Sequence, residues 1–215
     1  MNKMSENRTP KTKTAVLIGG TFNPFTNAHK EMAWSVRREY PEADVIYVPS
    51  NLEYIDRWKA LPGGKVFSGK NRVDLIAESV KDIPGCMVSD VESTGKVNGR
   101  TYITVQYFKQ EYDRVIICIG SDKLYEFERW YMAKELMEEA EIVLFTRGES
   151  LAECKSEFIL RHRDKIKEIE FPYPEVSSSL IRKLFEENRM EEIKQLVPEA
   201  VYRYLYDKKG EEMYE

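Results

Sequence analysis

The sequence contains little cysteine, little histidine and little net charge, and each shortage argues against a class of function. Only three of the 215 residues are cysteine and only two are histidine. No Cys-x-x-Cys pair is present and neither histidine lies in a cluster with metal-ligand spacing, so we expect no protein-held metal and no redox site. Widely spaced cysteines without such a pair are typical of a reducing compartment, and we expect a cytoplasmic protein.

The charge and the hydropathy pattern limit the partners. The formal net charge is -4, from 33 basic and 37 acidic side chains, whereas proteins that wrap nucleic acid usually carry a basic excess. No uncharged apolar stretch approaches the ~18 residues of a membrane-spanning helix. We therefore expect neither a nucleic-acid partner nor a membrane, and an anionic ligand must be bound by a local site. The sequence is compatible with a homo-oligomer.

What the sequence does contain is an alternation of strand-length apolar runs with segments of helical period. The strand candidates are residues 15–18, 45–48, 87–91, 115–119, 142–145 and 166–171, and the helix candidates include residues 28–40, 73–80 and 102–108. This alternation predicts a doubly wound parallel α/β sheet of the Rossmann-like type. From about residue 178 the strand signal ends, and a C-terminal part of three short helices is predicted. We expect a disordered tail at residues 1–13 and one domain over residues 14–210.

A first candidate site follows the first predicted strand, where Gly19 and Gly20 precede a turn and a helix that begins near Thr26. Adjacent glycines let the backbone bend tightly and let a ligand approach closely, and a helix N-terminus attracts phosphate. If Thr26 is the N-cap, His29 lies on the same end face of the helix, and both side chains would reach one anion. The spacing alone fits equally a capped helix with a surface histidine.

A second candidate site is the serine run before the apolar periodic segment near residue 180. A serine run at this place predicts a helix N-terminus, and Ser178, Ser179 and Arg182 share a face of that helix. Hydroxyls, free N–H groups and a guanidinium at one helix end would converge on a phosphate. From these residues alone, an ordinary serine cap with a solvated arginine is the alternative.

Together the two sites resemble a known signature. The sequence GGTFNP at residues 19–24, followed by Thr26 and His29, resembles the G-G-T-F-[DN]-P and [HT]-x-G-H motifs of the nucleotidylyltransferase superfamily. Residues 177–182 resemble its I-S-S-[ST]-x-I-R motif. The chain is most similar to the nicotinate and nicotinamide mononucleotide adenylyltransferases, although Ala28 stands where the signature has glycine.

The resemblance implies which residues act in catalysis and which bind ATP. Thr26, His29 and Arg182 would be catalytic, and Mg²⁺ would accompany ATP. The ATP-binding residues that the resemblance implies are Gly19, Gly20, Thr21, Phe22, Asn23, Ser178, Ser179, Asp122 and Arg147.

A third segment resembles the acceptor region of the mononucleotide adenylyltransferases. It comprises the sequence GSDKL at residues 120–124 and the pair Trp130 and Tyr131. In this resemblance Asp122 would hold a ribose hydroxyl, and the two aromatic rings would stack on a flat pyridine ring. Tyr102 is implied as a further acceptor-binding residue.

Two departures from the family concern the acceptor. Ile103 and Val105 replace polar residues of the family, which removes polar groups from that region. The family's P-P-H-K sequence is absent after the second predicted strand, so Lys59, Lys65 or Lys70 would have to take the place of its lysine.

The implied activity is transfer of AMP from ATP to nicotinate or nicotinamide mononucleotide, with release of pyrophosphate, in NAD biosynthesis. Three alternatives stay open: another phosphorylated acceptor such as phosphopantetheine, CTP as donor, and a nucleotide-binding module without turnover. A P-loop NTPase is disfavoured, because residues 64–71 approach the Walker A pattern but place Asn71 where Ser or Thr must bind magnesium.

Overall fold

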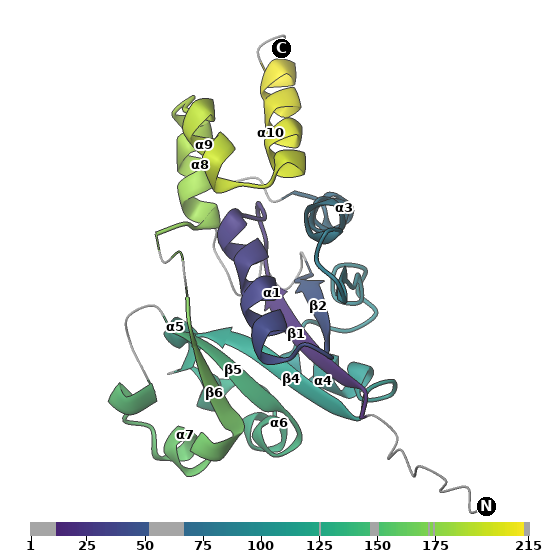
Figure 1. The fold of residues 1–215 in the computed structure, drawn as a ribbon, viewed down its shortest axis with the longest axis vertical. Helices are drawn as coiled ribbons and strands as arrows, with labels where there is room; N and C mark the ends of the chain where they lie inside the picture. Colours follow the sequence, from purple (N-terminus) through teal and green to yellow (C-terminus); the bar gives the residue numbers. More distant parts are fainter. Residues whose placement is uncertain are drawn as a thin grey trace, which may run out of the picture.

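The fold is built on one parallel sheet with the strand order β3-β2-β1-β4-β5-β6 (Figure 1). The computed structural model describes residues 12–51, 67–124, 126–146, 151–171, 173 and 175–212. The strands are β1 (Thr14–Gly20), β2 (Asp44–Pro49), β3 (Cys86–Val88), β4 (Arg114–Gly120), β5 (Glu141–Thr146) and β6 (Ile166–Glu170). The order reverses between β1 and β4, which confirms the predicted doubly wound arrangement.

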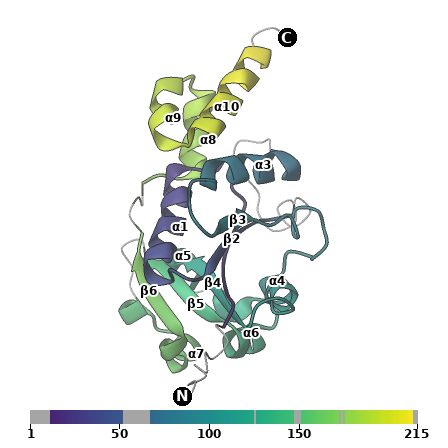
Figure 2. The same ribbon diagram turned by 45° about the vertical axis from the view of Figure 1, so that its right-hand side comes forward.

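Helices cover both faces of the sheet (Figures 1 and 2). The helices that share a core with one face are α1 (Asn27–Glu39), α3 (Gly69–Val80), α8 (Ser178–Glu186), α9 (Met190–Leu196) and α10 (Glu199–Glu212). The helices on the other face are α4 (Thr101–Phe108), α5 (Ser121–Leu124), α6 (Ala133–Glu139) and α7 (Glu157–Arg161). Short 3₁₀ turns are η1 (Phe127–Arg129), η2 (Leu151–Glu153) and η3 (Arg163–Lys165). No helix in the described ranges is long and apolar enough to span a bilayer.

The central strands β1, β2, β4 and β5 are nearly continuous apolar runs, because both faces of the parallel sheet are buried there. In β1, Val16 and Ile18 contribute to the core under α1, whereas Ala15 and Leu17 contribute to the core under α4 and α6. All four side chains are almost fully buried. Alternate residues of the same run therefore supply two separate cores.

The C-terminal helices α8, α9 and α10 lie beyond the carboxyl edge of the sheet, next to the start of α1 (Figure 1). Their apolar residues join the core of α1 and α3, so they extend that core rather than form one of their own. The three helices predicted from about residue 178 are confirmed. Their position brings the second candidate site to the same edge of the sheet as the first.

One predicted strand is shorter than expected. The run 87–91 predicts a strand to Val91, but β3 ends at Val88. The chain turns there because the Asp90 carbonyl accepts hydrogen bonds from the Thr94 N–H at 2.9 Å and the Thr94 hydroxyl at 2.7 Å. Val91 is apolar because it is buried beneath this turn. Of the predicted N-terminal tail, residues 1–11 lie outside the described residues.

Candidate functional site

A cavity of about 1210 Å³ opens at the carboxyl edge of the sheet, where β1 and β4 lie side by side. This is the point at which the strand order reverses, and open α/β sheets bind ligands at such points. The walls come from the ends of β1 and β4, the first turns of α1, the connection from β3 to α4, and the segment after α5. The predicted site residues that line it are Gly19, Gly20, Phe22, His29, Asp122, Trp130 and Tyr131.

The two glycines serve different purposes in the loop after β1. A Cβ built on Gly20 would lie 2.8 Å from Cζ of Phe22, so the ring of Phe22 occupies the space beside Gly20. Phe22 itself has a left-handed backbone with φ of 50°. A Cβ built on Gly19 would meet no protein atom within 4 Å. The Gly19 backbone is therefore accessible from the cavity, and a ligand can approach it closely.

Thr26 is the N-cap of α1, as predicted, and it holds His29 in place. The Thr26 N–H donates to His29 Nδ1 at 3.0 Å, and the Thr26 hydroxyl lies 2.9 Å from the same atom. Because a backbone N–H is always a donor, Nδ1 must accept, and the neutral ring carries its proton on Nε2. The rings of Phe22 and Phe25 pack against the imidazole, with centroids 5.1 and 5.5 Å away.

This geometry changes the interpretation of Thr26. The side chain is fully buried at 0% exposure, and its hydroxyl is engaged by His29. Within the described part of the chain, only His29 of this pair lines the cavity. The contacts of Thr26 orient His29, and a direct catalytic role of Thr26 stays a prediction.

The second motif packs directly on the first. Arg182 Nη1 donates to the Asn23 carbonyl at 2.6 Å, and the Ser178 hydroxyl donates to the Pro24 carbonyl at 2.8 Å. Arg182 Nη2 also donates to the Ser179 hydroxyl at 3.0 Å. The two motifs thus meet in space, as predicted, although they are far apart in the sequence.

The contacts of the second motif are with the loop after β1, and its predicted contact with ATP stays a prediction. None of Ser178, Ser179 and Arg182 is among the described residues that line the cavity; Ser178 and Arg182 donate to the loop after β1, and Ser179 accepts from Arg182. Burial lowers the pKa of Arg182, and its Nε is buried without a hydrogen-bond partner among the described residues. The motif therefore stabilises the position of the loop after β1, and the Arg182 Nε–H makes no hydrogen bond to the described residues.

The predicted acceptor residues divide into two groups. Trp130 and Tyr131 line the cavity, and Trp130 packs on Phe127 with ring centroids 5.0 Å apart. Tyr102 is not among the described lining residues, because its hydroxyl donates to Glu139 at 3.5 Å. Its ring lies 6.3 Å from that of Tyr131, so it supports the wall from outside.

The departures at α4 and in the first turn of α1 do not face the cavity. Val105 is fully buried in the core and Ile103 packs against that core, whereas Thr101 and Thr104 of the same helix line the cavity. Ala28 is likewise buried in the core under α1 rather than placed in the lining.

Several predicted residues lie elsewhere or cannot be placed. Arg147, Lys59 and Lys65 fall outside the described residues. Lys70 forms an ion pair with Asp74 on the exposed side of α3 and does not line the cavity. Thr21 and Asn23 make their contacts through backbone carbonyls and, for Asn23, through a side chain on the buried side of the loop. The Asn23 Oδ1 accepts from the Phe67 N–H at 3.0 Å.

Arg72 is a residue that the sequence interpretation missed. It is 1% exposed, and its guanidinium donates to the carbonyls of Thr21 at 2.9 Å, Ser50 at 2.7 Å and Phe67 at 3.1 Å. Burial lowers its pKa to about 10, and within the described ranges no carboxylate pairs with it. A signal was present, because Arg72 shares the buried face of α3 with Ile76.

Glu92 is a second missed residue. Glu92 lines the cavity although it is only 7% exposed, and its carboxylate accepts a hydrogen bond of 2.6 Å from the Thr104 hydroxyl. The sequence offers no helical or strand period there, because Glu92 lies in the turn after β3.

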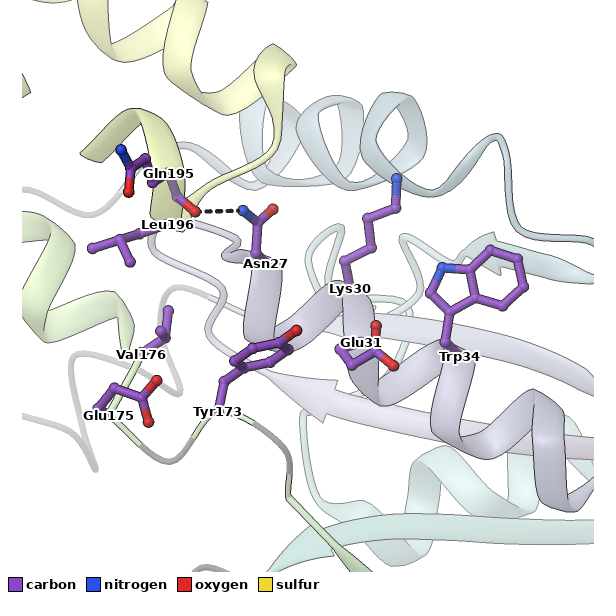
Figure 3. A pocket seen from close by; sticks show the side chains of 9 residues that line it. All are labelled: Asn27, Lys30, Glu31, Trp34, Tyr173, Glu175, Val176, Gln195 and Leu196. Carbon is purple, nitrogen blue, oxygen red and sulfur yellow. Dashed lines mark hydrogen bonds between the residues drawn. The ribbon is translucent and has the colours of Figure 1, made fainter. Parts of the chain in front are cut away.

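A smaller hollow of about 460 Å³ lies beside α1 and contains none of the predicted site residues (Figure 3). Asn27 Nδ2 donates to the Gln195 carbonyl at 3.0 Å across its upper edge, which ties α1 to α9. The hollow is lined by Asn27, Lys30, Glu31, Trp34, Tyr173, Glu175, Val176, Gln195 and Leu196. The chemistry predicted from sequence is therefore concentrated in the other cavity.

Known proteins resemble this chain in sequence and in fold. Residues 17–184 match the model of a family described as Cytidylyltransferase-like. A probable nicotinate-nucleotide adenylyltransferase of Caldicellulosiruptor saccharolyticus is 31% identical over 199 residues, which cover 89% of this chain and 95% of that protein. One from Thermosipho melanesiensis is 29% identical over 172 residues, covering 78% of this chain and 82% of that protein.

A solved structure shares the fold. The nicotinic acid mononucleotide adenylyltransferase of Plasmodium falciparum, complexed with NaAD, superimposes with a TM-score of 0.68 over 91% of this chain and 96% of its own. Its sequence identity of 22% extends the similarity to the fold alone.

Proposed function

The chain belongs to the cytidylyltransferase-like family, and on that premise we propose that it transfers AMP from ATP to nicotinate or nicotinamide mononucleotide in NAD biosynthesis. The observation that carries the proposal is the cavity at the reversal point of the sheet. One part of its lining contains the accessible backbone of Gly19 and the start of α1, and another part contains the aromatic pair Trp130 and Tyr131. The names of the relatives support a pyridine mononucleotide as the acceptor.

The proposed reaction is an in-line displacement. An oxygen of the acceptor 5′-phosphate forms a bond to the α-phosphorus of ATP, and the bond from that phosphorus to the bridging oxygen of pyrophosphate breaks. The attacking phosphate is already an anion near pH 7, so no general base is required. Catalysis then consists of positioning and stabilisation of charge.

The loop after β1 would bind the phosphates of ATP. Gly19 gives the closest approach, and the N-terminus of α1 adds its partial positive charge. The N–H group at His29 Nε2 would donate a hydrogen bond to a phosphate oxygen, because Thr26 engages the opposite ring nitrogen. Arg182 would act by fixing the loop through the Asn23 carbonyl.

The acceptor would occupy the other part of the cavity. Trp130 and Tyr131 would receive the pyridine ring, and Asp122, whose side chain is exposed in the lining, would accept from a ribose hydroxyl. A role for Arg147 in binding ATP stays a prediction. So do the cytoplasmic location, a homo-oligomer and the lack of a nucleic-acid partner.

A magnesium ion fits this site as a companion of ATP. No group of three or more His, Cys, Asp or Glu side chains gathers anywhere in the described ranges. Magnesium commonly binds proteins through substrate phosphates with few protein ligands, and phosphate oxygens would hold it here. When bound, it would offset the charge that develops on the leaving pyrophosphate.

The proposal is tested by incubating the protein with ATP, Mg²⁺ and single acceptors, and measuring pyrophosphate. We expect release with nicotinate or nicotinamide mononucleotide and none with phosphopantetheine. Replacing ATP by CTP should abolish the signal. Tight ATP binding without pyrophosphate from any acceptor would instead indicate a nucleotide-binding module and refute the proposed activity.

A further inference from the structure

The wall of the cavity contains an arginine, Arg100, whose guanidinium makes no hydrogen bond to the described residues. Arg100 lines the cavity, and its guanidinium carbon lies 4.3 Å from the centre of the Tyr131 ring. Among the described residues, none accepts a hydrogen bond from this guanidinium and none forms an ion pair with it. A stacked guanidinium keeps the donors along its edges available, and these match the two oxygens of a carboxylate.

The backbone of Arg100 is fixed, so the side chain starts from a defined point. Its N–H donates to the Asn98 Oδ1 at 3.1 Å, and its carbonyl accepts from the Thr104 N–H at 3.1 Å. Gly99 before it has φ of 74°, a left-handed turn that glycine adopts without strain. Arg100 is therefore the N-cap residue of α4, but its side chain makes no capping bond.

Other cations in the lining differ from Arg100. Lys123 is held by Asp122 at 3.7 Å and by Glu126 at 3.3 Å, so its charge is offset within the protein. Arg129 also lines the cavity, but no aromatic contact like that between Arg100 and Tyr131 is recorded for it in the described residues. Arg100 is thus the lining cation oriented by an aromatic ring of the proposed acceptor site.

We propose that Arg100 binds the ring carboxylate of a nicotinate-type acceptor and so sets the preference for the acid over the amide. The inference rests on the proposed function. A pyridine mononucleotide acid has two anionic groups, and its phosphate must meet ATP near Gly19 and His29. The anion that reaches the aromatic end is then the ring substituent. A carboxylate accepts two charge-assisted hydrogen bonds from a guanidinium, whereas a carboxamide has one oxygen and no charge.

The assignment of Arg100 also explains how the acceptor can be recognised although Ile103 and Val105 replace polar residues of the family. Those side chains face the core, so they leave acceptor recognition to residues on the cavity side of α4. Arg100 is on that side, one residue before the helix begins.

The test compares kcat/KM for nicotinate mononucleotide and nicotinamide mononucleotide, at saturating ATP, in the wild type, Arg100→Gln, Arg100→Lys and Arg129→Gln. Arg100→Gln should lower the value for the acid by about 10- to 100-fold and change the value for the amide by less than about twofold. Arg100→Lys keeps the charge without the planar pair of donors and should recover part of the loss. Arg129→Gln removes the same charge from the same cavity and should affect both acceptors alike.

The outcomes separate the two proposals. A wild type that releases pyrophosphate with neither acceptor would overturn the proposed function and this inference together. A wild type that uses the acid, with Arg100→Gln lowering both acceptors equally or neither, would overturn only the role of Arg100. Equal loss of acid preference in Arg100→Gln and Arg129→Gln would indicate a general field of positive charge and would also overturn it. Because Arg100 is exposed, thermal melts of these variants should superimpose on that of the wild type.

Discussion

Arg182 Nη1 donates a hydrogen bond of 2.6 Å to the carbonyl oxygen of Asn23, and this contact joins segments 159 positions apart in the chain. It makes the loop after β1 depend on α8 for its position. A substitution in α8 should therefore change the handling of a ligand bound in the cavity, although the described residues of α8 do not line that cavity.

Arg182→Ala should lower kcat/KM for ATP by roughly 10- to 100-fold, as expected for loss of a charge-assisted hydrogen bond worth about 1.5–3 kcal/mol. Steady-state kinetics with varied ATP measure the effect. Arg189→Ala is the matched control, because Arg189 also lies in the C-terminal part but is engaged by Glu187 and Glu192. Unchanged ATP affinity and rate in Arg182→Ala would show that the contact with Asn23 has no functional role.

His29→Ala should leave the fold intact and lower turnover by about 10²–10³, the usual cost of losing one donor that stabilises developing charge. The measurement is single-turnover AMP transfer alongside a thermal melt. His162→Ala serves as the control, since His162 caps α7, where its Nδ1 lies 2.8 Å from the Phe158 carbonyl. Near-normal transfer by His29→Ala would contradict the role assigned to the imidazole.

Much of this architecture could be predicted from the sequence, because two periods carry the information. The continuous apolar runs specify a sheet buried on both faces, and the residues that recur every three or four positions specify its helices. β3 was predicted too long, since Val91 is apolar for a reason that a linear pattern cannot express: it is buried beneath a turn.

The site was predicted only in part, because sequence spacing shows which residues share a helix face but not what that face meets. Ser179 and Arg182 do share a face, yet that face meets the loop after β1 rather than the cavity. Arg72 was missed although its helical period with Ile76 placed it among buried residues. A buried arginine gains its meaning from the carbonyls around it, and these come from three separate segments of the chain.

Arg72→Met should be among the most destabilising single changes in the chain, because it removes the guanidinium that donates to three backbone carbonyl groups, one of them, at Ser50, in a buried contact. Each such group costs about 1–3 kcal/mol, so the loss should exceed about 3 kcal/mol. Urea unfolding measures it. Lys70→Met, two residues earlier on the exposed side of α3, removes only a surface ion pair with Asp74 and should change stability by less than about 1 kcal/mol. Equal unfolding midpoints for the two variants would contradict the bracing role of Arg72.

Alanine substitutions at the two glycines of the loop after β1 should separate stability from ligand binding. Gly20→Ala places a methyl group 2.8 Å from the Phe22 ring, so the loop must shift and the melting temperature should fall. Gly19→Ala meets no protein atom within 4 Å and should melt like the wild type. Its methyl group nevertheless projects where the ligand is expected to approach the backbone, so KM for ATP should rise by at least about tenfold, the effect of about 1.4 kcal/mol. Thermal melts and ATP titrations of the same two preparations provide the comparison. A normal KM in a stable Gly19→Ala protein would mean that ATP does not lie against this backbone, and the proposed position of the phosphates would have to be abandoned.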